Sequence, residues 1–420
     1  MNYKLPLAAG LIMALSFASV FAQAPTDEDS QGPTSETSTS PVAFVYIASG
    51  STDSIDGGPL QTYGFAAAAN GKLTKIPGSP FAAADVQYMG VNGKYLFGTM
   101  TGDDGSTVGI ETFSIASNGA LKSAQTFKYK ESSSDFTFPW SLGLDHFDQV
   151  VYVDLGLSDP DAEVFQALGI DQSNGKLHSI AQTSIDPDSP TAWLSFLADN
   201  KFAYSADTSL SACAEHRGLV GFTRASNGKL TTLNIGNPIP PAPEANHYYC
   251  VQALSTDPSN HIAAALYDED ASGKQYGNPV MATFTVSSTG ELTTTSTSKN
   301  MPQVIVGANE GPPNVSWIRM SPSGELLAVA SYEGIEIFHF NGSSPMTKFK
   351  SVNFGQGPYG VTQVYWDNAN HLYVYDGDFR LAVFNVTSTS VTPAPGSPYS
   401  VPFGTSQDET SPGGLIVLPR

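Results

Sequence analysis

Charged residues are scarce in this chain, at 14% of 420 residues, and only 19 residues are Lys or Arg. Surface helices need Lys, Glu and Arg on their solvent faces, so this scarcity argues against a helical protein. Gly (39) and Pro (29) are plentiful and favour short strands joined by many turns. The formal charge of −20 disfavours nucleic acid and anionic lipid as partners, because both are negatively charged.

Cysteine is also scarce, since Cys213 and Cys250 are the two in the sequence. A lone pair in an exported protein predicts a disulfide, with two buried thiols as the alternative. The bridge would close a loop of about 37 residues and contribute roughly 3–4 kcal/mol in the chain-entropy model.

Long apolar runs are absent after the first residues, so no transmembrane span is expected. Lys4, the apolar stretch Leu5 to Phe21 and the small residues Ala22 and Ala24 predict a cleaved export signal over residues 1–24. Residues 25–40 contain mostly Ser, Thr, Pro and acidic side chains, which predicts a disordered tether. We therefore expect a periplasmic or secreted protein whose folded part covers residues 41–420.

A turn that recurs along the chain organises this folded part. Asn-Gly-Lys-Leu or a close variant places glycine at positions 71, 119, 175 and 228, and Thr-Gly-Glu-Leu repeats it at 290. Asn-Gly between alternating apolar runs is a strong hairpin signal, because a type I′ turn needs two residues with positive φ. Recurrence at 48 to 62 residues indicates an array of similar all-β modules.

The modules number seven, each with four short antiparallel strands, except that the first has three: Ala43 to Ala48, Leu60 to Ala66 and Leu73 to Ile76. Gly414 to Leu418 can supply the missing innermost strand. Pro395 to Pro398 also repeats the Pro-Gly-Ser-Pro of residues 77–80. The sequence therefore predicts a seven-bladed β-propeller whose first blade is closed by the C-terminal strand, which removes open sheet edges.

The two faces of such a ring differ in sequence. Hairpin turns between strands one and two and strands three and four lie on what we call the turn face, and they are short. The loops between strands two and three, and the crossings between blades, lie on the opposite loop face and are longer. Acids and aromatic residues gather there and suit sugars or organic cations, although loop capping and strand packing can also explain them. The candidate ligand-binding residues are Tyr88, Trp140, Asp154, Asp159, Trp193, Tyr248, Trp317 and Tyr359.

The blade plan, the Asn-Gly-Lys-Leu turns and the Pro-Gly-Ser-Pro segments resemble the lactonase family of propellers, which includes 6-phosphogluconolactonases and muconate cycloisomerases. The Asp-Leu-Gly run starting at Asp154 is the most specific piece. The resemblance implies lactone hydrolysis by a set of His, Arg and acidic residues on the loop face. Phe138 to Ser141 and Ser189 to Trp193 lack the expected His and Arg, and Ala330-Ser331 replaces an Asn-Arg pair. Asp207 can stand for the family's acid.

The remaining catalytic candidates lie beside the cysteines: Glu215, His216 and Arg217, and also His247 with Glu244. They are expected to form a relocated catalytic set, with a general base, an acid and a cation that stabilises the developing oxyanion. The alternative is that they are polar loop residues. No cofactor is expected, with calcium on Asp268 to Asp270 or on Asp159 and Asp161 as the alternative.

These patterns favour an exported, monomeric, lactonase-like propeller in which the family's catalytic set is degenerate, and which binds a sugar-like or cationic small molecule, or a protein partner. Whether it is an enzyme is left open. The alternatives are a lactone hydrolase with relocated catalytic residues and a scaffold of the cell envelope.

Overall fold

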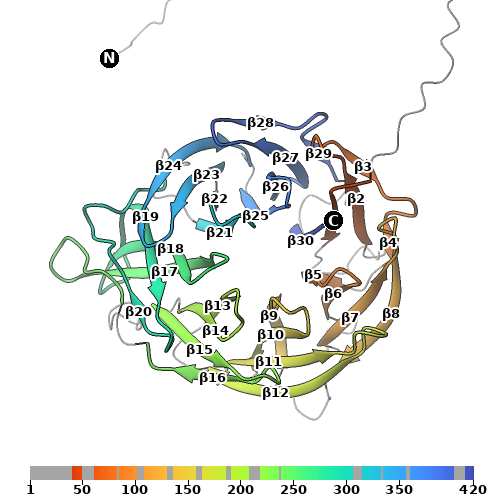
Figure 1. Cartoon of the computed structure of the whole chain (residues 1–420), viewed down its shortest axis with the longest axis horizontal. Coiled ribbons are helices and arrows are strands. Elements are labelled where there is room, and N and C mark those ends of the chain that lie inside the picture. The colour runs from red at the N-terminus through yellow and green to blue at the C-terminus, as the bar shows by residue number, and fades with distance from the viewer. Residues whose placement is uncertain are drawn as a thin grey trace, which may run out of the picture. The chain divides into compact units, whose positions relative to one another are not determined.

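Seven antiparallel sheets surround a central axis in the computed structural model, which confirms the predicted seven-bladed propeller (Figure 1). The structure describes residues 40–49, 61–82, 85–101, 108–129, 136–157, 163–185, 191–207, 218–235, 238–305, 315–332, 334–355, 360–401 and 412–420. Among these residues no helix is long and apolar enough to cross a membrane. The signal and tether predicted for residues 1–40 lie almost entirely outside the described residues.

Six blades follow the chain from the innermost strand outwards. Blade 2 contains β5 (Asp85–Val91), β6 (Tyr95–Thr101), β7 (Val108–Ile115) and β8 (Leu121–Lys128). Blade 3 contains β9 (Phe136–Leu144), β10 (Val150–Leu157), β11 (Glu163–Ile170) and β12 (Leu177–Ile185). Blade 4 contains β13 (Thr191–Phe196), β14 (Phe202–Asp207), β15 (Leu219–Arg224) and β16 (Leu230–Leu233). Blade 5 contains β17 (His247–Thr256), β18 (His261–Asp270), β19 (Gln275–Val286) and β20 (Leu292–Thr293). Blade 6 contains β21 (Val315–Met320), β22 (Leu326–Ser331), β23 (Gly334–Asn341) and β24 (Ser344–Asn353), and blade 7 contains β25 (Val361–Trp366), β26 (His371–Asp376), β27 (Arg380–Val386) and β28 (Val391–Pro393).

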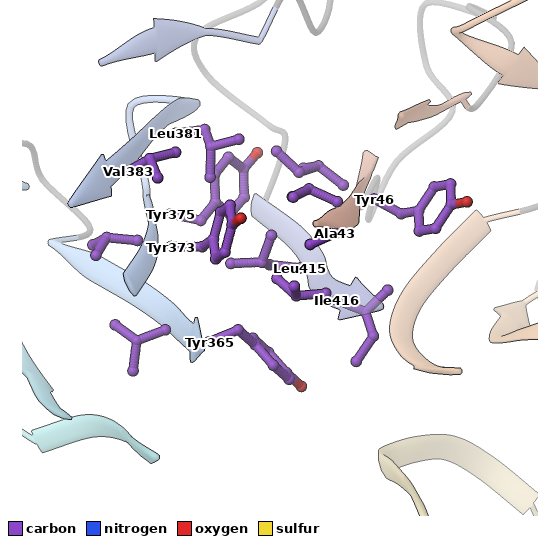
Figure 2. Close-up of a cluster of buried hydrophobic side chains, with 14 of the residues drawn as sticks. Ala43, Tyr46, Tyr365, Tyr373, Tyr375, Leu381, Val383, Leu415 and Ile416 are labelled. Atoms are coloured by element: carbon purple, nitrogen blue, oxygen red, sulfur yellow. The ribbon is translucent and has the colours of Figure 1, made fainter. Parts of the chain in front are cut away.

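Blade 1 joins the two ends of the folded chain. Its strand order is β3 (Leu73–Lys75), β2 (Gln61–Ala67), β1 (Ala43–Ser49) and β30 (Pro412–Pro419), so the C-terminal strand is innermost, as predicted. β1 and β30 pair antiparallel, with Tyr46 opposite Ile416. Figure 2 shows Leu415 of β30 beside Tyr373 and Tyr375 of blade 7, which seals the ring with buried apolar surface.

The two Pro-Gly-Ser-Pro segments occupy equivalent places in blades 1 and 7, which explains their similarity. Each is followed by a two-residue strand on the third strand of its blade: β4 (Phe81–Ala82) pairs with β2, and β29 (Tyr399–Ser400) pairs with β27. Ser79 Oγ accepts a 2.9 Å hydrogen bond from the Gly64 N–H, and Ser397 Oγ accepts one of 2.9 Å from the Val383 N–H. The serine thus completes the edge of the third strand.

The recurring glycine turns connect each blade to its predecessor. Tyr46, Tyr152 and Tyr204 donate their hydroxyl groups to the carbonyl oxygens of Gly119, Gly228 and Gly290 in the next blade, at 2.8, 2.7 and 2.8 Å. All three tyrosines are buried, and burial raises the pKa of each phenol. The turn identified in the sequence is therefore a contact between blades as well as a hairpin.

Blade 5 extends further than predicted. The apolar runs of the sequence predict strands over residues 251–255, 262–267 and 280–286, but β17 begins at His247, β18 ends at Asp270 and β19 begins at Gln275. The extra residues are mostly polar, so apolar periodicity does not mark them. Side-chain bonds across the hairpin hold this extension, including Gln275 Nε2 to Glu269 Oε1 at 3.0 Å.

Candidate ligand-binding site

Aromatic side chains from separate blades meet on the axis of the ring. Trp193 of blade 4 contacts Tyr88 of blade 2 and Trp317 of blade 6, with ring centroids 5.3 and 4.2 Å apart. Tyr365 of blade 7 continues the row, 6.2 Å from Trp317. Because blades 2, 4 and 6 are not neighbours, their side chains can meet only across the central channel. These four residues, here called the aromatic row, lie in the central channel.

A cavity of about 860 Å³ extends from the aromatic row towards the turn face. Its walls are the inner strands, and its mouth is formed by the turns between first and second strands, including Asn92, Asp148, Asp257 and Asn368. A volume near 1,000 Å³ suits a small-molecule ligand. The short turns therefore surround an opening at the centre of the turn face, whereas the sequence predicts a site on the loop face.

The cavity mouth carries a titratable acid at Asp148. Desolvation of its carboxyl raises the pKa of Asp148 to about 6, repulsion from Asp145 adds to this, and His146 opposes it. The residue is exposed as a whole and has a φ of 55°, and its N–H bonds to the Asp145 carbonyl at 3.0 Å. A carboxyl that exchanges its proton near neutral pH can donate or accept hydrogen bonds to a ligand at this opening.

Other acids on the turn face stabilise turns. Asp145 Oδ1 accepts the N–H groups of Gln149 and Val150 at 2.9 and 3.1 Å. Asp257 and Asp367 hold their turns in the same way and also bond to His261 and His371 through Nδ1, at 2.9 and 2.7 Å. Their carboxylates are occupied by the backbone and by these imidazoles, which is a structural role.

Polar groups line the cavity wall beside the aromatic row. Ser195 Oγ and Thr256 Oγ1 lie 3.1 Å apart, and the Thr256 hydroxyl donates to the Phe196 carbonyl at 2.7 Å. Arg319 lies on β21, two residues after Trp317, and its guanidinium lies over the Tyr365 ring, 4.5 Å from the centroid. The cavity therefore combines ring faces, hydroxyl groups and one cation.

A second constellation lies at the loop-face end of blade 5. His247 Nδ1 lies 2.8 Å from Asp268 Oδ1, and the imidazole packs on Tyr276 with centroids 4.5 Å apart. The Tyr276 hydroxyl donates to Asp270 Oδ2 at 2.8 Å. A carboxylate that holds Nδ1 orients the imidazole and leaves Nε2 to accept a proton, which is the arrangement of a general base.

The predicted ligand-binding residues divide into three groups. Tyr88, Trp193 and Trp317 come together in the aromatic row. Asp154 is buried in β10, and its charge adds to the burial that raises the pKa of Tyr88, so it lies near the row. Tyr248 is half-buried on β17 and lies outside the described lining of the cavity. Asp159 and Tyr359 lie outside the described residues, as does the side chain of Trp140.

Nothing in the structure tests the predicted catalytic roles. Glu215, His216 and Arg217 lie outside the described residues, and the structure describes Asp207 only through its backbone in β14. The side chain of His247 is described, and its carboxylate partner is Asp268 instead of the expected Glu244, whose backbone carbonyl accepts the His247 N–H. Blade 5 is long enough to bring β18 beside β17 at this point, which the sequence did not indicate.

The disulfide stays a prediction. Cys250 is buried in β17, and the described part of the chain holds no free cysteine. Cys213, its predicted partner, lies outside the described residues.

The calcium alternative stays untested, and its carboxylates in blade 5 have hydrogen-bond partners of their own. Asp268 bonds to His247, and Asp270 bonds to Ser272 and Tyr276, so both carboxylates are occupied. Hydrogen bonds to Ser272 and Tyr276 hold the pKa of Asp270 well below its usual range. In the parts of the chain that the structure describes, no group of three His, Cys, Asp or Glu side chains could hold a metal ion. Asp159 and Asp161 are not among these residues.

Sequence reasoning missed Tyr365, Arg319 and Asp148. A signal exists for Arg319, since residues two apart on a strand share a face and Trp317 was already a candidate. Tyr365 lies near the turn-face end of β25, and Asp148 lies in a short turn, so the expectation of a site on the loop face excluded both.

Comparison with known proteins supports the fold. No protein-family model matches the sequence, and no curated protein matches it. Solved structures are similar, including a “putative 6-phosphogluconolactonase” from Bacteroides uniformis (14% identity, TM-score 0.62, 90% of this chain and 99% of that chain covered). A protein of the same description from Bacteroides fragilis has 16% identity and a TM-score of 0.60, with coverage of 90% and 98%. The periplasmic gluconolactonase of Pseudomonas aeruginosa has 12% identity and a TM-score of 0.59, with coverage of 90% and 99%.

Proposed function

We propose that this lactonase-like propeller binds a polyhydroxylated sugar derivative in the cavity between the aromatic row and the turn face. The observation that carries the proposal is the row itself, a set of ring faces that forms one end of a cavity of about 860 Å³. Sugars present C–H faces that pack on aromatic rings and hydroxyl groups that bond to polar side chains. Ser195 and Thr256 supply such polar groups on the wall.

The names of the structurally similar proteins support a sugar-derived ligand. Three of them are described as gluconolactonases or 6-phosphogluconolactonases, whose substrates are sugar-derived lactones. Export is part of the proposal, because the predicted signal over residues 1–24 would bring the protein to periplasmic or extracellular sugars. A cationic ligand or a protein partner on the acidic loop face stays a prediction, since many of those acids lie outside the described residues.

Trp193 provides the test of the cavity. Titration with D-glucono-1,5-lactone, gluconate and glucitol should change tryptophan fluorescence, because Trp193, Trp317 and Trp366 all line the cavity. Trp193→Leu should weaken each affinity about 10-fold, the equivalent of one lost ring contact of about 1.4 kcal/mol. Calorimetry checks the affinities.

The matched control is Tyr332→Leu, which removes an exposed ring outside the cavity lining and should leave binding unchanged. If none of the three ligands binds the purified mature protein, or if Trp193→Leu binds as the wild type does, the proposal is wrong.

Lactone hydrolysis is a second candidate function, favoured by the 2.8 Å contact between His247 Nδ1 and Asp268 Oδ1. His247 would act as the general base that activates water for attack on the lactone carbonyl. His247→Gln should then reduce the rate at least 100-fold, since general bases contribute 10²–10⁴-fold. A pH-stat assay with D-glucono-1,5-lactone, corrected for spontaneous hydrolysis, measures the rate.

His261→Gln is a close control, because His261 also bonds an aspartate through Nδ1, at 2.9 Å, but at the turn-face end of the neighbouring strand β18. His261→Gln should keep the wild-type rate. A wild-type protein that does not accelerate hydrolysis would remove this function and leave binding unaffected.

A further inference from the structure

Arg319 is the cation of the cavity described above. Its side chain is exposed within a protein that carries 39 acidic and 19 basic residues, and it lines the cavity wall. Its guanidinium lies over the Tyr365 ring, with the guanidinium carbon 4.5 Å from the ring centroid. Among the described residues, no carboxylate lies within ion-pair distance of Arg319.

Other described arginines contrast with this arrangement. Arg224 is paired with Asp145, and Arg380 is paired with Asp376 and Asp378. Arg420 also lies over a ring, that of Phe44 at 5.1 Å, but away from the cavity lining. Arg319 therefore stands out as an arginine that lines the cavity without a carboxylate partner among the described residues.

The surroundings of Arg319 fix its position. The Trp366 indole N–H donates to the Arg319 carbonyl oxygen at 3.1 Å, and Arg319 pairs with Ala328 across β21 and β22. A guanidinium that lies over a ring face can still donate hydrogen bonds from its N–H edge to another partner. A planar N–H edge matches a carboxylate, to which it donates two parallel hydrogen bonds.

We propose that the ligand of this cavity is a hydroxylated carboxylic acid whose carboxylate is bound by Arg319 and whose carbon chain lies along the aromatic row. The inference rests on the proposed function, since it names the chemical class of the ligand for the same cavity. The net charge of −20 repels anions, and Arg319 offsets this repulsion locally within the cavity. Arg319 selects the open-chain acid over the neutral lactone or alcohol.

Gluconate and glucitol form a pair that tests this, because they share a six-carbon polyhydroxylated chain and differ in the carboxylate. The wild-type protein should bind gluconate about 10–100-fold more tightly than glucitol, as expected for charge-assisted hydrogen bonds of about 1.5–3 kcal/mol. Arg319→Gln should abolish the preference, so that gluconate and glucitol bind with similar affinities. Arg420→Gln removes a ring-stacked arginine outside the cavity and should retain the preference. Calorimetry on the purified mature proteins measures all six affinities.

The outcomes separate this inference from the proposed function. Equal binding of gluconate and glucitol by the wild type contradicts the carboxylate site but leaves sugar binding intact. A preference that survives in Arg319→Gln assigns it to another group and also overturns the inference. If glucose 6-phosphate binds more tightly than gluconate, the group that Arg319 binds is a phosphate, and the carboxylate inference is wrong. Failure of every ligand to bind ends both proposals together.

Discussion

Arg224→Met is expected to lower the free energy of unfolding by about 3–5 kcal/mol, because it leaves the Asp145 carboxylate buried without its cation. The Arg224 and Asp145 side chains are only 4% and 0% exposed, and Arg224 Nη2 bonds to Asp145 Oδ2. Arg224 Nε also donates to the Tyr152 hydroxyl at 3.0 Å. The change therefore breaks a network between blades 3 and 4. Chemical denaturation, followed by tryptophan fluorescence, measures the loss.

Two further variants identify the cause of that loss. Arg224→Met combined with Asp145→Asn should recover much of the stability, because the amide removes the unpaired charge and keeps an oxygen for the backbone N–H groups. Lys201→Met breaks the exposed pair with Asp199, whose side chains are 73% and 49% exposed, and should change stability by less than about 0.5 kcal/mol. A loss of similar size in Arg224→Met and Lys201→Met would refute a buried network.

Gly290→Ala is expected to destabilise the protein by about 2–5 kcal/mol. Gly290 has a φ of +87°, which costs a residue with a Cβ about 1–2 kcal/mol. A Cβ there would also lie 2.3 Å from Leu233 Cδ2 and 2.7 Å from Phe202 Cε1, and overpacking of this kind costs about 1–3 kcal/mol more. The displaced turn would weaken the hydrogen bond from Tyr204 to the Gly290 carbonyl.

Gly93→Ala separates the two contributions. Gly93 has nearly the same φ, +84°, but a Cβ there meets no atom within 4 Å. Its alanine variant should lose only the backbone contribution of about 1–2 kcal/mol. Equal losses in the two variants would show that the contact between blades 4 and 5 contributes nothing. Thermal and chemical denaturation of both variants provide the comparison.

The architecture of the ring could be predicted because its signals are local. Each Asn-Gly turn marks one hairpin, and the period between the turns counts the blades. The first module lacked a strand and the C-terminus offered one, so the closure of β30 onto β1 followed from counting. Those inferences depend on turn chemistry and on apolar alternation, and both are properties of neighbouring residues.

The candidate site could be predicted only in part, because it depends on which blades lie opposite each other. The sequence identified Tyr88, Trp193 and Trp317 as residues facing a site but placed them on loop-face walls. The ring diameter instead lets their side chains meet on the axis, so the cavity that they bound opens towards the turns. Spacing along the chain contains no measure of that diameter.

The sequence by itself determined the all-β class, the number of blades, the strand order and the closure of the ring, since turn and strand preferences act between close neighbours. Tertiary structure alone decided that the repeated glycine turns are contacts between blades, that Asp268 orients His247, and that Arg319 lies in a cavity without an acidic partner among the described residues. Each of these is a distance between side chains far apart in sequence or on separate strands. Such distances are set by packing across the whole ring.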